Sequence, residues 1–226
     1  MTRGRSLYPA ALPPRGGVVE TARMRLFAAV VPPPAAIREL AAAVAPLHAL
    51  PQAGPLRWTG EPTWHLTLAF LGQVDPADLA ELGAGLARAA ATVDRAPELR
   101  LAGGGRFGER ALWADVEGDV RPLGRLADEV SAAARATGIA VDERPFRAHL
   151  TLARSGGRTG PPPAGVSLAP LVAALADFKG TVWPAGTLRL MRSHLGVGAA
   201  HYETVGTWNL GGPDSVLGGP VPAQPL

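Results

Sequence analysis

The sequence contains the same five residues, His-Leu-Thr-Leu-Ala, at two places. The copies occupy residues 65–69 and 149–153, a spacing of 84 residues. With only five histidines in 226 residues, even the shorter pattern His-x-Thr is expected less than once by chance. The repeat therefore predicts two related halves of the chain, each bringing one imidazole and one hydroxyl to a shared site.

Both copies lie in stretches where apolar and polar residues alternate, which predicts a β-strand. Side chains two positions apart on a strand share one face and stand about 6.6 Å apart along it. His65 and Thr67 are thus expected on one face, with the neighbouring leucines in the core, and His149 and Thr151 repeat the arrangement. One such strand could simply have a solvated polar face, but two identical copies favour a functional site.

The composition narrows the possible chemistry. The chain has no cysteine, which excludes disulfides, zinc-finger sites and a thiol nucleophile. Its acidic residues do not cluster at metal-ligand spacing and no H-E-x-x-H is present, so we predict no metal and no cofactor. The net charge is +3, and the basic residues, all arginine except Lys179, are scattered rather than grouped in a nucleic-acid-binding stripe.

The ends of the chain differ from its middle. Residues 1–23 and 211–226 are rich in Pro and Gly without apolar periodicity, and we predict disordered tails on either side of a folded domain at 24–210. The sequence has no apolar run of membrane-spanning length and no secretory signal pattern, which favours a cytoplasmic protein. We expect a monomer.

Within residues 24–210 the pattern alternates between short strands and helices, which predicts an α+β fold of two similar lobes. Asp75 is expected to cap a helix that begins at residue 76. The expected strands are 25–31, 64–71, 98–102, 111–117, a segment after residue 145, 178–183, 187–194 and 201–209, and the expected helices are 34–50, 76–93, 120–137 and 170–176.

Other motifs carry less weight. The run Gly103–Gly108 matches G-x-G-x-x-G, but a strand rather than a helix is expected after it, so we interpret it as the loop of a β-hairpin. His48 is expected to be structural or exposed, and His194 and His201 to be hairpin residues. The five tryptophans could stack on a base but are expected mainly in the core.

The two His-x-Thr motifs resemble those of the two-histidine (2H) phosphoesterase superfamily, whose mark is a pair of H-x-[TS]-x motifs. More narrowly, the chain resembles the bacterial RNA 2′,3′-cyclic phosphodiesterases, also called 2′-5′ RNA ligases, over about residues 24–210. The supporting segments are 24–27, 64–72, 144–154 and 193–196. Two positions depart from the family pattern, since Ala148 replaces the usual Pro and Trp64 replaces a common Phe.

This resemblance implies two pseudo-symmetric lobes, each with an antiparallel sheet and flanking helices, around a central cleft. It implies metal-independent hydrolysis of RNA 2′,3′-cyclic phosphate ends to 2′-phosphates, and also 2′-5′ ligation. His65 is implied as the proton donor to the leaving 3′-oxygen and His149 as the proton acceptor from water, although two imidazoles alone do not fix which is the acid. Thr67, Thr151 and Arg154 would bind the phosphate.

Two other functions remain open at this point. The enzyme could act on small cyclic nucleotides or 2′-5′ oligonucleotides instead of RNA ends. The chain could also be a non-catalytic module that binds nucleotides or RNA. Intact His and Thr in both motifs favour an enzyme.

Overall fold

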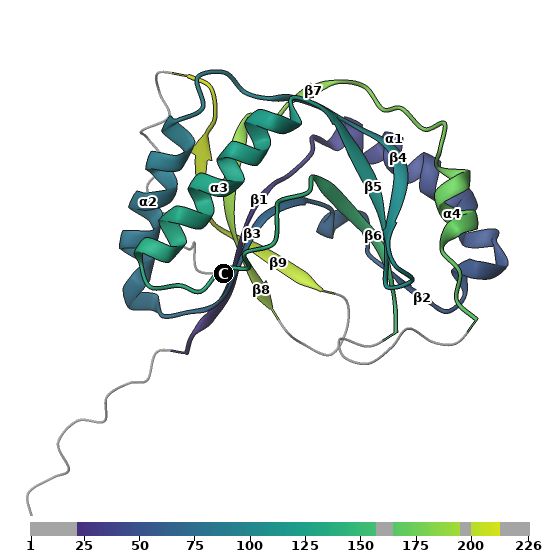
Figure 1. The fold of residues 1–226 in the computed structure, drawn as a ribbon, viewed down its shortest axis with the longest axis horizontal. Helices are drawn as coiled ribbons and strands as arrows, with labels where there is room; N and C mark the ends of the chain where they lie inside the picture. The colour runs from purple at the N-terminus through teal and green to yellow at the C-terminus, as the bar shows by residue number, and fades with distance from the viewer. Residues whose placement is uncertain (1–21, 157–164, 195–199, 213–226) are drawn as a thin grey trace, which may run out of the picture.

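The structure, a computed structural model, describes residues 22–156, 165–194 and 200–212. Figure 1 shows strands in the middle of the molecule, with helices α2 and α3 at one side and α1 and α4 at the other. The predicted disordered tails lie almost wholly outside the described residues.

The helices are α1 (Pro34–Val44), α2 (Leu79–Ala91), α3 (Val120–Ala136) and α4 (Ala169–Ala174). The strands are β1 (Met24–Val30), β2 (Leu56–Trp58), β3 (Leu66–Val74), β4 (Glu98–Phe107), β5 (Ala111–Gly118), β6 (His149–Ser155), β7 (Trp183–Pro184), β8 (Thr187–His194) and β9 (His201–Asn209). Short 3₁₀ turns cover 45–49, 51–53, 61–63 and 76–78.

The strands pair antiparallel in the order β7-β4-β5-β6-β3-β1-β8-β9, with β2 added to β6. The two motif strands, β3 and β6, are the central neighbours, and they pair through one register pair, Leu66 with Leu150. On either side the strands pair over many residues. The sheet thus consists of two halves, β7-β4-β5-β6 and β3-β1-β8-β9, which meet between the two motifs.

The two halves repeat one unit. β1, α1 and β3 form the first copy, and β5, α3 and β6 form the second. The helices cross over between the halves: α1 packs against β4 of the other half, and α3 packs against β3 and α2 of the other half. Each half of the sheet is therefore covered in part by the helix of the other copy.

The capping prediction at Asp75 is confirmed. Its side chain accepts a hydrogen bond of 3.0 Å from the Ala77 backbone N–H. A 3₁₀ turn begins directly after it and leads into α2, whose Leu82 and Leu86 are fully buried. These two leucines, four residues apart, lie on one face of the helix, which packs into the core.

The prediction that Gly103–Gly108 forms the hairpin loop is wrong. Most of this run belongs to β4, and the turn comes later, at residues 108–110. Gly103 has φ +62° beside a register shift between Ala102 and Gly104, which is a β-bulge. Gly105 lies opposite Trp113, and a Cβ at Gly105 would overlap the Trp113 ring. The glycines are thus needed for packing inside a strand.

The strand predicted at 178–183 is also wrong. This segment has only an isolated bridge between Ala102 and Lys179 and the first residue of the two-residue strand β7. Glu39 of α1 instead accepts hydrogen bonds of 2.7 Å from the backbone N–H and the hydroxyl of Thr181. Strand β2 was not predicted, because three residues are too few to show a periodic pattern.

Candidate active site

The two histidines are held in the same way. His65 Nδ1 lies 2.7 Å from the Thr63 carbonyl oxygen, and His149 Nδ1 lies 2.8 Å from the Arg147 carbonyl oxygen. A carbonyl only accepts, so Nδ1 carries the proton in both rings. Within the described residues neither Nε2 has a hydrogen-bond partner. Each Nε2 can therefore accept a proton when its ring is neutral and donate one when it is charged.

The antiparallel register brings the four polar side chains of the motifs together. Because Leu66 lies opposite Leu150, position 65 is across from position 151, and position 67 is across from position 149. Each histidine is thus a cross-strand neighbour of the threonine of the other copy. As predicted, the leucines at 66, 68, 150 and 152 are buried while the histidines and threonines are partly exposed.

Both motif strands carry the same irregularity. In the pairing of β3 with β1, Ala69 and Thr67 have successive partners and Leu68 is skipped. In the pairing of β6 with β5, Ala153 and Thr151 have successive partners and Leu152 is skipped. A bulge directly after each threonine bends the strand and changes the direction of nearby side chains, so the repeat extends to backbone detail.

Aromatic rings surround the two imidazoles, but to different degrees. The centroid of the His65 ring lies 4.7 Å from that of Phe27 and 5.3 Å from that of Tyr202, which meets it edge-on. The ring of His149 meets Phe107 edge-on at 4.9 Å and lies 6.1 Å from Trp113.

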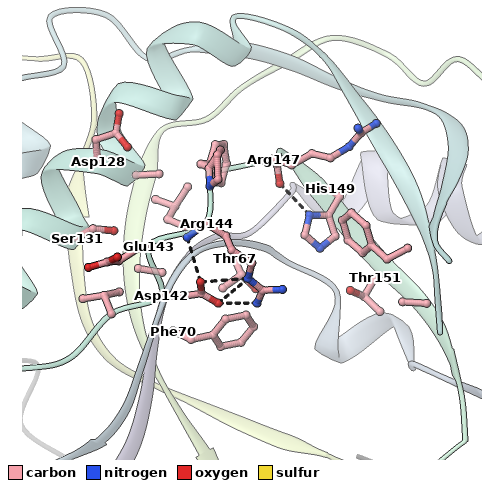
Figure 2. Close-up of a pocket in the computed structure, with 18 of the residues that line it drawn as sticks. Thr67, Phe70, Asp128, Ser131, Asp142, Glu143, Arg144, Arg147, His149 and Thr151 are labelled. Carbon is pink, nitrogen blue, oxygen red and sulfur yellow. Dashed lines mark hydrogen bonds and ion pairs between the residues drawn. The ribbon is translucent and has the colours of Figure 1, made fainter. Parts of the chain in front are cut away.

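A cavity of about 890 Å³ opens beside the second motif. Thr67, His149, Thr151 and Arg154 line it, whereas His65 does not. Figure 2 shows His149 and Thr151 on one side of Thr67, and the Asp142–Arg144 pair with Phe70 on the other. Arg144 Nη2 lies 2.5 Å from Asp142 Oδ2. The site is thus an open cavity with His65 at its enclosed margin.

The protein lowers the pKa of both histidines. Burial away from water is the largest cause in each case, and the hydrogen bond to the carbonyl opposes it. The positive charge of Arg154 lowers both pKa values further, and His149 lowers that of His65. Arg154 lines the same cavity as His149 and the two motif threonines, so its charge is available to an anion that binds there.

Arg147 supports the second histidine through more than its carbonyl group. Its guanidinium lies 4.5 Å from the centroid of the Trp113 ring, and its Nη2 lies 3.7 Å from Asp115 Oδ2. Asp115 is opposite His149 in the sheet. The ion pair and the stacked ring hold the segment that positions the His149 imidazole.

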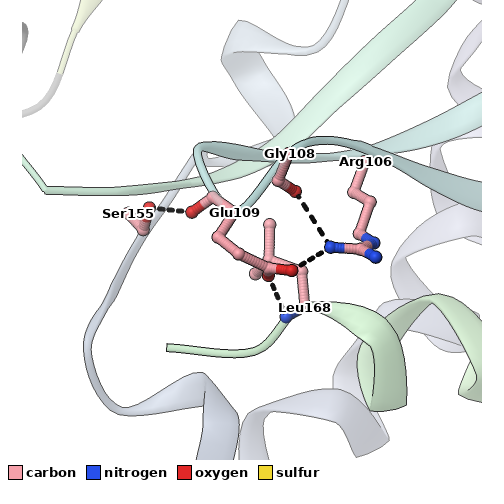
Figure 3. A network of polar contacts seen from close by, with 5 residues as sticks. All are labelled: Arg106, Gly108, Glu109, Ser155 and Leu168. Atoms are coloured by element: carbon pink, nitrogen blue, oxygen red, sulfur yellow. Dashed lines mark hydrogen bonds and ion pairs between the residues drawn. The ribbon is translucent and has the colours of Figure 1, made fainter. Parts of the chain in front are cut away.

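The β4–β5 turn directly follows Phe107, whose ring contacts His149. Glu109 holds this turn in place (Figure 3). The Glu109 carboxylate forms an ion pair with Arg106 and accepts a 2.6 Å hydrogen bond from the backbone N–H of Leu168, just before α4. The Glu109 carbonyl accepts from the Ser155 hydroxyl at the end of β6. One residue thus links the turn, the second motif strand and α4.

The structure places all five residues predicted for the site, His65, Thr67, His149, Thr151 and Arg154, around the junction of β3 and β6. Sequence reasoning missed the aromatic side chains and Arg147. The only sequence feature that could have indicated Arg147 is its position two residues before His149, since Thr63 has the same relation to His65. His48 and the hairpin histidines lie elsewhere: His48 stacks on Trp58, and His194 pairs with Glu203.

Two segments of the chain, residues 31–113 and 115–201, each match the family described as LigT like Phosphoesterase. The chain belongs to this family. Each matching segment contains one His-x-Thr motif, which agrees with the repeat in the fold and confirms the resemblance inferred from the motifs.

Two curated relatives illustrate the family. The RNA 2′,3′-cyclic phosphodiesterase of Geobacillus stearothermophilus is 41% identical over 102 residues, which cover 43% of this chain and 32% of that protein. This alignment spans about a third of the relative's length. The RNA 2′,3′-cyclic phosphodiesterase of Aeropyrum pernix is 28% identical over 155 residues, which cover 67% of this chain and 84% of that protein.

Solved structures of the family have the same fold. The E. coli LigT complex with 3′-AMP superposes with a TM-score of 0.62 and 27% identity, covering 83% of this chain and 98% of LigT. A protein of Thermus thermophilus superposes with a TM-score of 0.63 and 29% identity, covering 84% and 100%. The predicted two-lobed α+β fold is therefore confirmed. None of the helices in the described segments is long and apolar enough to cross a membrane.

Proposed function

We propose that the protein hydrolyses 2′,3′-cyclic phosphates at RNA ends to 2′-phosphates by acid–base catalysis with His65 and His149. The observation that carries this proposal is the matched pair of imidazoles, each with Nδ1 bonded to a carbonyl and Nε2 without a partner in the described residues. One ring can be neutral while the other is charged near neutral pH. The curated relatives named RNA 2′,3′-cyclic phosphodiesterase support the substrate class.

In the proposed reaction His149 Nε2 removes a proton from water, whose oxygen attacks phosphorus. The bond from phosphorus to the 3′-oxygen breaks, and His65 Nε2–H protonates that oxygen, leaving a 2′-phosphate and a 3′-hydroxyl. The position of His149 supports this assignment, because His149 lines the open cavity, where water can reach it. Burial and the charge of His149 lower the pKa of His65, so in this proposal the bound phosphate anion holds His65 in its charged form.

The non-bridging phosphate oxygens gain charge during the reaction and need donors. The hydroxyls of Thr67 and Thr151 line the cavity, and neither has a hydrogen-bond partner in the described residues. The exposed guanidinium of Arg154 adds a positive charge near both histidines. Such donors stabilise a developing anion when they are already oriented, so we propose that no metal ion is needed.

Two exposed aromatic rings support a nucleotide substrate. Phe70 is 56% exposed and Phe107 is 42% exposed, and both line the cavity. Exposed aromatic rings beside a phosphate-binding site suit unpaired bases, which stack on them. E. coli LigT has been crystallised with 3′-AMP and with ATP. A 5′-hydroxyl of RNA that attacks phosphorus in place of water, with the same loss of the 3′-oxygen, would give a 2′-5′ bond, and this ligation is part of the proposal.

The test is to incubate the purified protein with an RNA ending in a 2′,3′-cyclic phosphate, in the presence of EDTA, and to identify the product. We expect a 2′-phosphate and an unchanged rate with EDTA. A 3′-phosphate product would show that the leaving group is the 2′-oxygen and not the 3′-oxygen. Loss of turnover in EDTA, restored by a divalent ion, would contradict metal independence. Binding of the RNA without any turnover would instead indicate a non-catalytic binding module.

A further inference from the structure

A second hollow, of about 680 Å³, lies next to the first motif: Trp64, which lines it, directly precedes His65, and Arg189 is in the same cross-strand row as Thr67, through Ala29. It forms where the segment after β1 and the start of α1 meet the turn before the first motif and the start of β8. Its walls are mostly apolar, with prolines at 32–34, Pro62, Pro184 and Trp64. Neither motif histidine lines it, and it shares no lining residue with the catalytic cavity.

One cation in this hollow has no counter-ion. Arg189 is half-buried on β8, between the fully buried core residues Leu188 and Leu190. Its Nε is buried and has no hydrogen-bond partner, and no carboxylate of the described residues lies within ion-pair distance of it. A buried donor without a partner costs free energy unless something else satisfies it. Because this Nε is closed off from solvent, an anion in the hollow would meet the other N–H groups of the partly exposed Arg189 side chain and would balance its charge.

The other charges of the hollow lie at its surface. Arg38 lies on α1, and Glu61 is exposed in the 3₁₀ turn before the first motif. Neither forms an ion pair within the described residues. The hollow thus has one acidic and two basic side chains, and the buried, unpartnered donor belongs to a basic one. A guanidinium with free N–H groups matches the geometry of two phosphate oxygens.

We propose that this hollow is a second phosphate-binding site, in which Arg189 binds the phosphate and Arg38 makes an outer contact. The prolines and Trp64 provide an apolar wall for the sugar or base attached to the phosphate. The phosphate could belong to a free nucleotide or to the RNA chain whose end is in the catalytic cavity. The proposal goes beyond the proposed activity and does not depend on it, since the hollow contains no catalytic group.

Two tryptophans report on the two sites, and because Trp64 directly precedes His65, a Trp64 response is assigned to the hollow only where it depends on Arg189. Trp64 lines the hollow, with its indole Nε1–H bonded to Thr59, and Trp113 lies beside His149. Their indole ¹⁵N–¹H signals can be followed during titration with inorganic phosphate, 5′-AMP or adenosine. We expect 5′-AMP and phosphate to shift the Trp64 signal with saturation, and adenosine, which has no phosphate, to leave it unchanged.

Substitutions of Arg189 test whether the Trp64 response depends on its guanidinium. Arg189→Met should weaken the Trp64 response at least tenfold and leave the Trp113 response intact, and Arg189→Lys should keep part of it. Arg192→Met is the matched control, because Arg192 is on the same strand and lines neither cavity. If Arg189→Met does not fold, Arg38→Met removes a charge at the rim and should still weaken binding several-fold.

Kinetics with RNA distinguish the two sources of the phosphate. If it belongs to the RNA chain, Arg189→Met raises KM for an RNA of several nucleotides and leaves KM for a cyclic mononucleotide unchanged. If it belongs to a free nucleotide, neither KM changes and 5′-AMP shifts Trp64 while the catalytic cavity is occupied. The proposal is overturned if no phosphate-bearing probe gives a Trp64 response that depends on Arg189, whether or not the enzyme turns over.

Discussion

At the scale of single residues, the two catalytic candidates differ in their surroundings but not in how they are held. Both imidazoles bond through Nδ1 to the carbonyl two residues earlier. One is enclosed by Phe27 and Tyr202, and the other lines an open cavity. In the proposed mechanism the hydrogen bonds of the rings, which are alike, cannot distinguish acid from base, so the distinction has to come from access to water and from the bound phosphate.

We expect His65→Ala and His149→Ala each to lower kcat/KM on a cyclic phosphate by about 10² to 10⁴, the usual contribution of one general acid or base. His201→Ala serves as a control, because this exposed histidine lies on β9 away from the cavity. All three should melt near the wild-type temperature, measured by circular dichroism. Near-wild-type turnover in either motif variant would rule out the paired mechanism.

The pH dependence of the rate should be bell-shaped, since one ring must be neutral and the other charged. The fold lowers the pKa of both rings. In the free enzyme both rings therefore become neutral at a lower pH than two ordinary imidazoles would. The basic limb of kcat/KM should therefore lie below about pH 6.5. The two limbs belong to the coupled pair and not to one residue each.

A bound phosphate anion favours the charged imidazole. The basic limb of kcat, which reports the enzyme–substrate complex, should therefore lie at higher pH than the limb of kcat/KM. Both profiles can be measured on one substrate from acidic to alkaline pH. A basic limb that lies lower in kcat than in kcat/KM, or is missing from both, would contradict a histidine acid.

At the scale of elements, the features that could be predicted from the sequence are ones that depend on local periodicity and local capping. The alternating pattern placed the motif threonines and histidines on the correct face, and Asp75 marked the start of a helix. Pairing between distant strands leaves no local pattern. Gly105 looked like part of a turn because its partner, Trp113, is recognised only once β4 and β5 are aligned. The aromatic shell of His65 was missed for the same reason, since Tyr202 comes from β9.

The packing of Gly105 against Trp113 gives a prediction at this scale. In Gly105→Ala the added methyl overlaps the indole, and such overpacking costs roughly 1–3 kcal/mol. For a protein of this size that lowers Tm by about 2–12 °C. Because Trp113 also flanks His149, kcat/KM should fall as well. Gly54→Ala is the control, since a Cβ there meets only ordinary contacts, and equal melting temperatures of the two variants would contradict the packing role.

At the scale of the whole molecule, the two halves depend on each other. They meet through one register pair in the sheet, Leu66 with Leu150, which is too little to hold two independent lobes in a fixed geometry. The crossed helices provide the remaining connection, since α1 contacts β4 and α3 contacts β3. Most buried residues form one large continuous cluster that includes both helices and both halves of the sheet, and Phe27, Ala29 and Met191 form a small second cluster.

We therefore expect a single cooperative unfolding transition. Calorimetric and van't Hoff enthalpies should agree, and fluorescence and circular dichroism should give the same midpoint. Leu126→Ala, in α3, should lower the stability of the whole molecule by about 2–5 kcal/mol, because Leu126 is fully buried. An exposed control in the same helix is Glu129→Ala. Two separate transitions, or loss of only one half in Leu126→Ala, would contradict this interdependence.

The exchange of helices between the repeats also bears on how such a chain could arise. A lone β–α–β unit would leave its helix without a sheet to cover, so it would need a second copy that exchanged helices with it. In that symmetric pair both histidines would meet at a two-fold axis with identical surroundings, and neither could be permanently acid or base. Fusion of the copies into one chain lets Tyr202 enclose one ring and Trp113 flank the other. On this account, the two histidines could acquire different surroundings only after duplication.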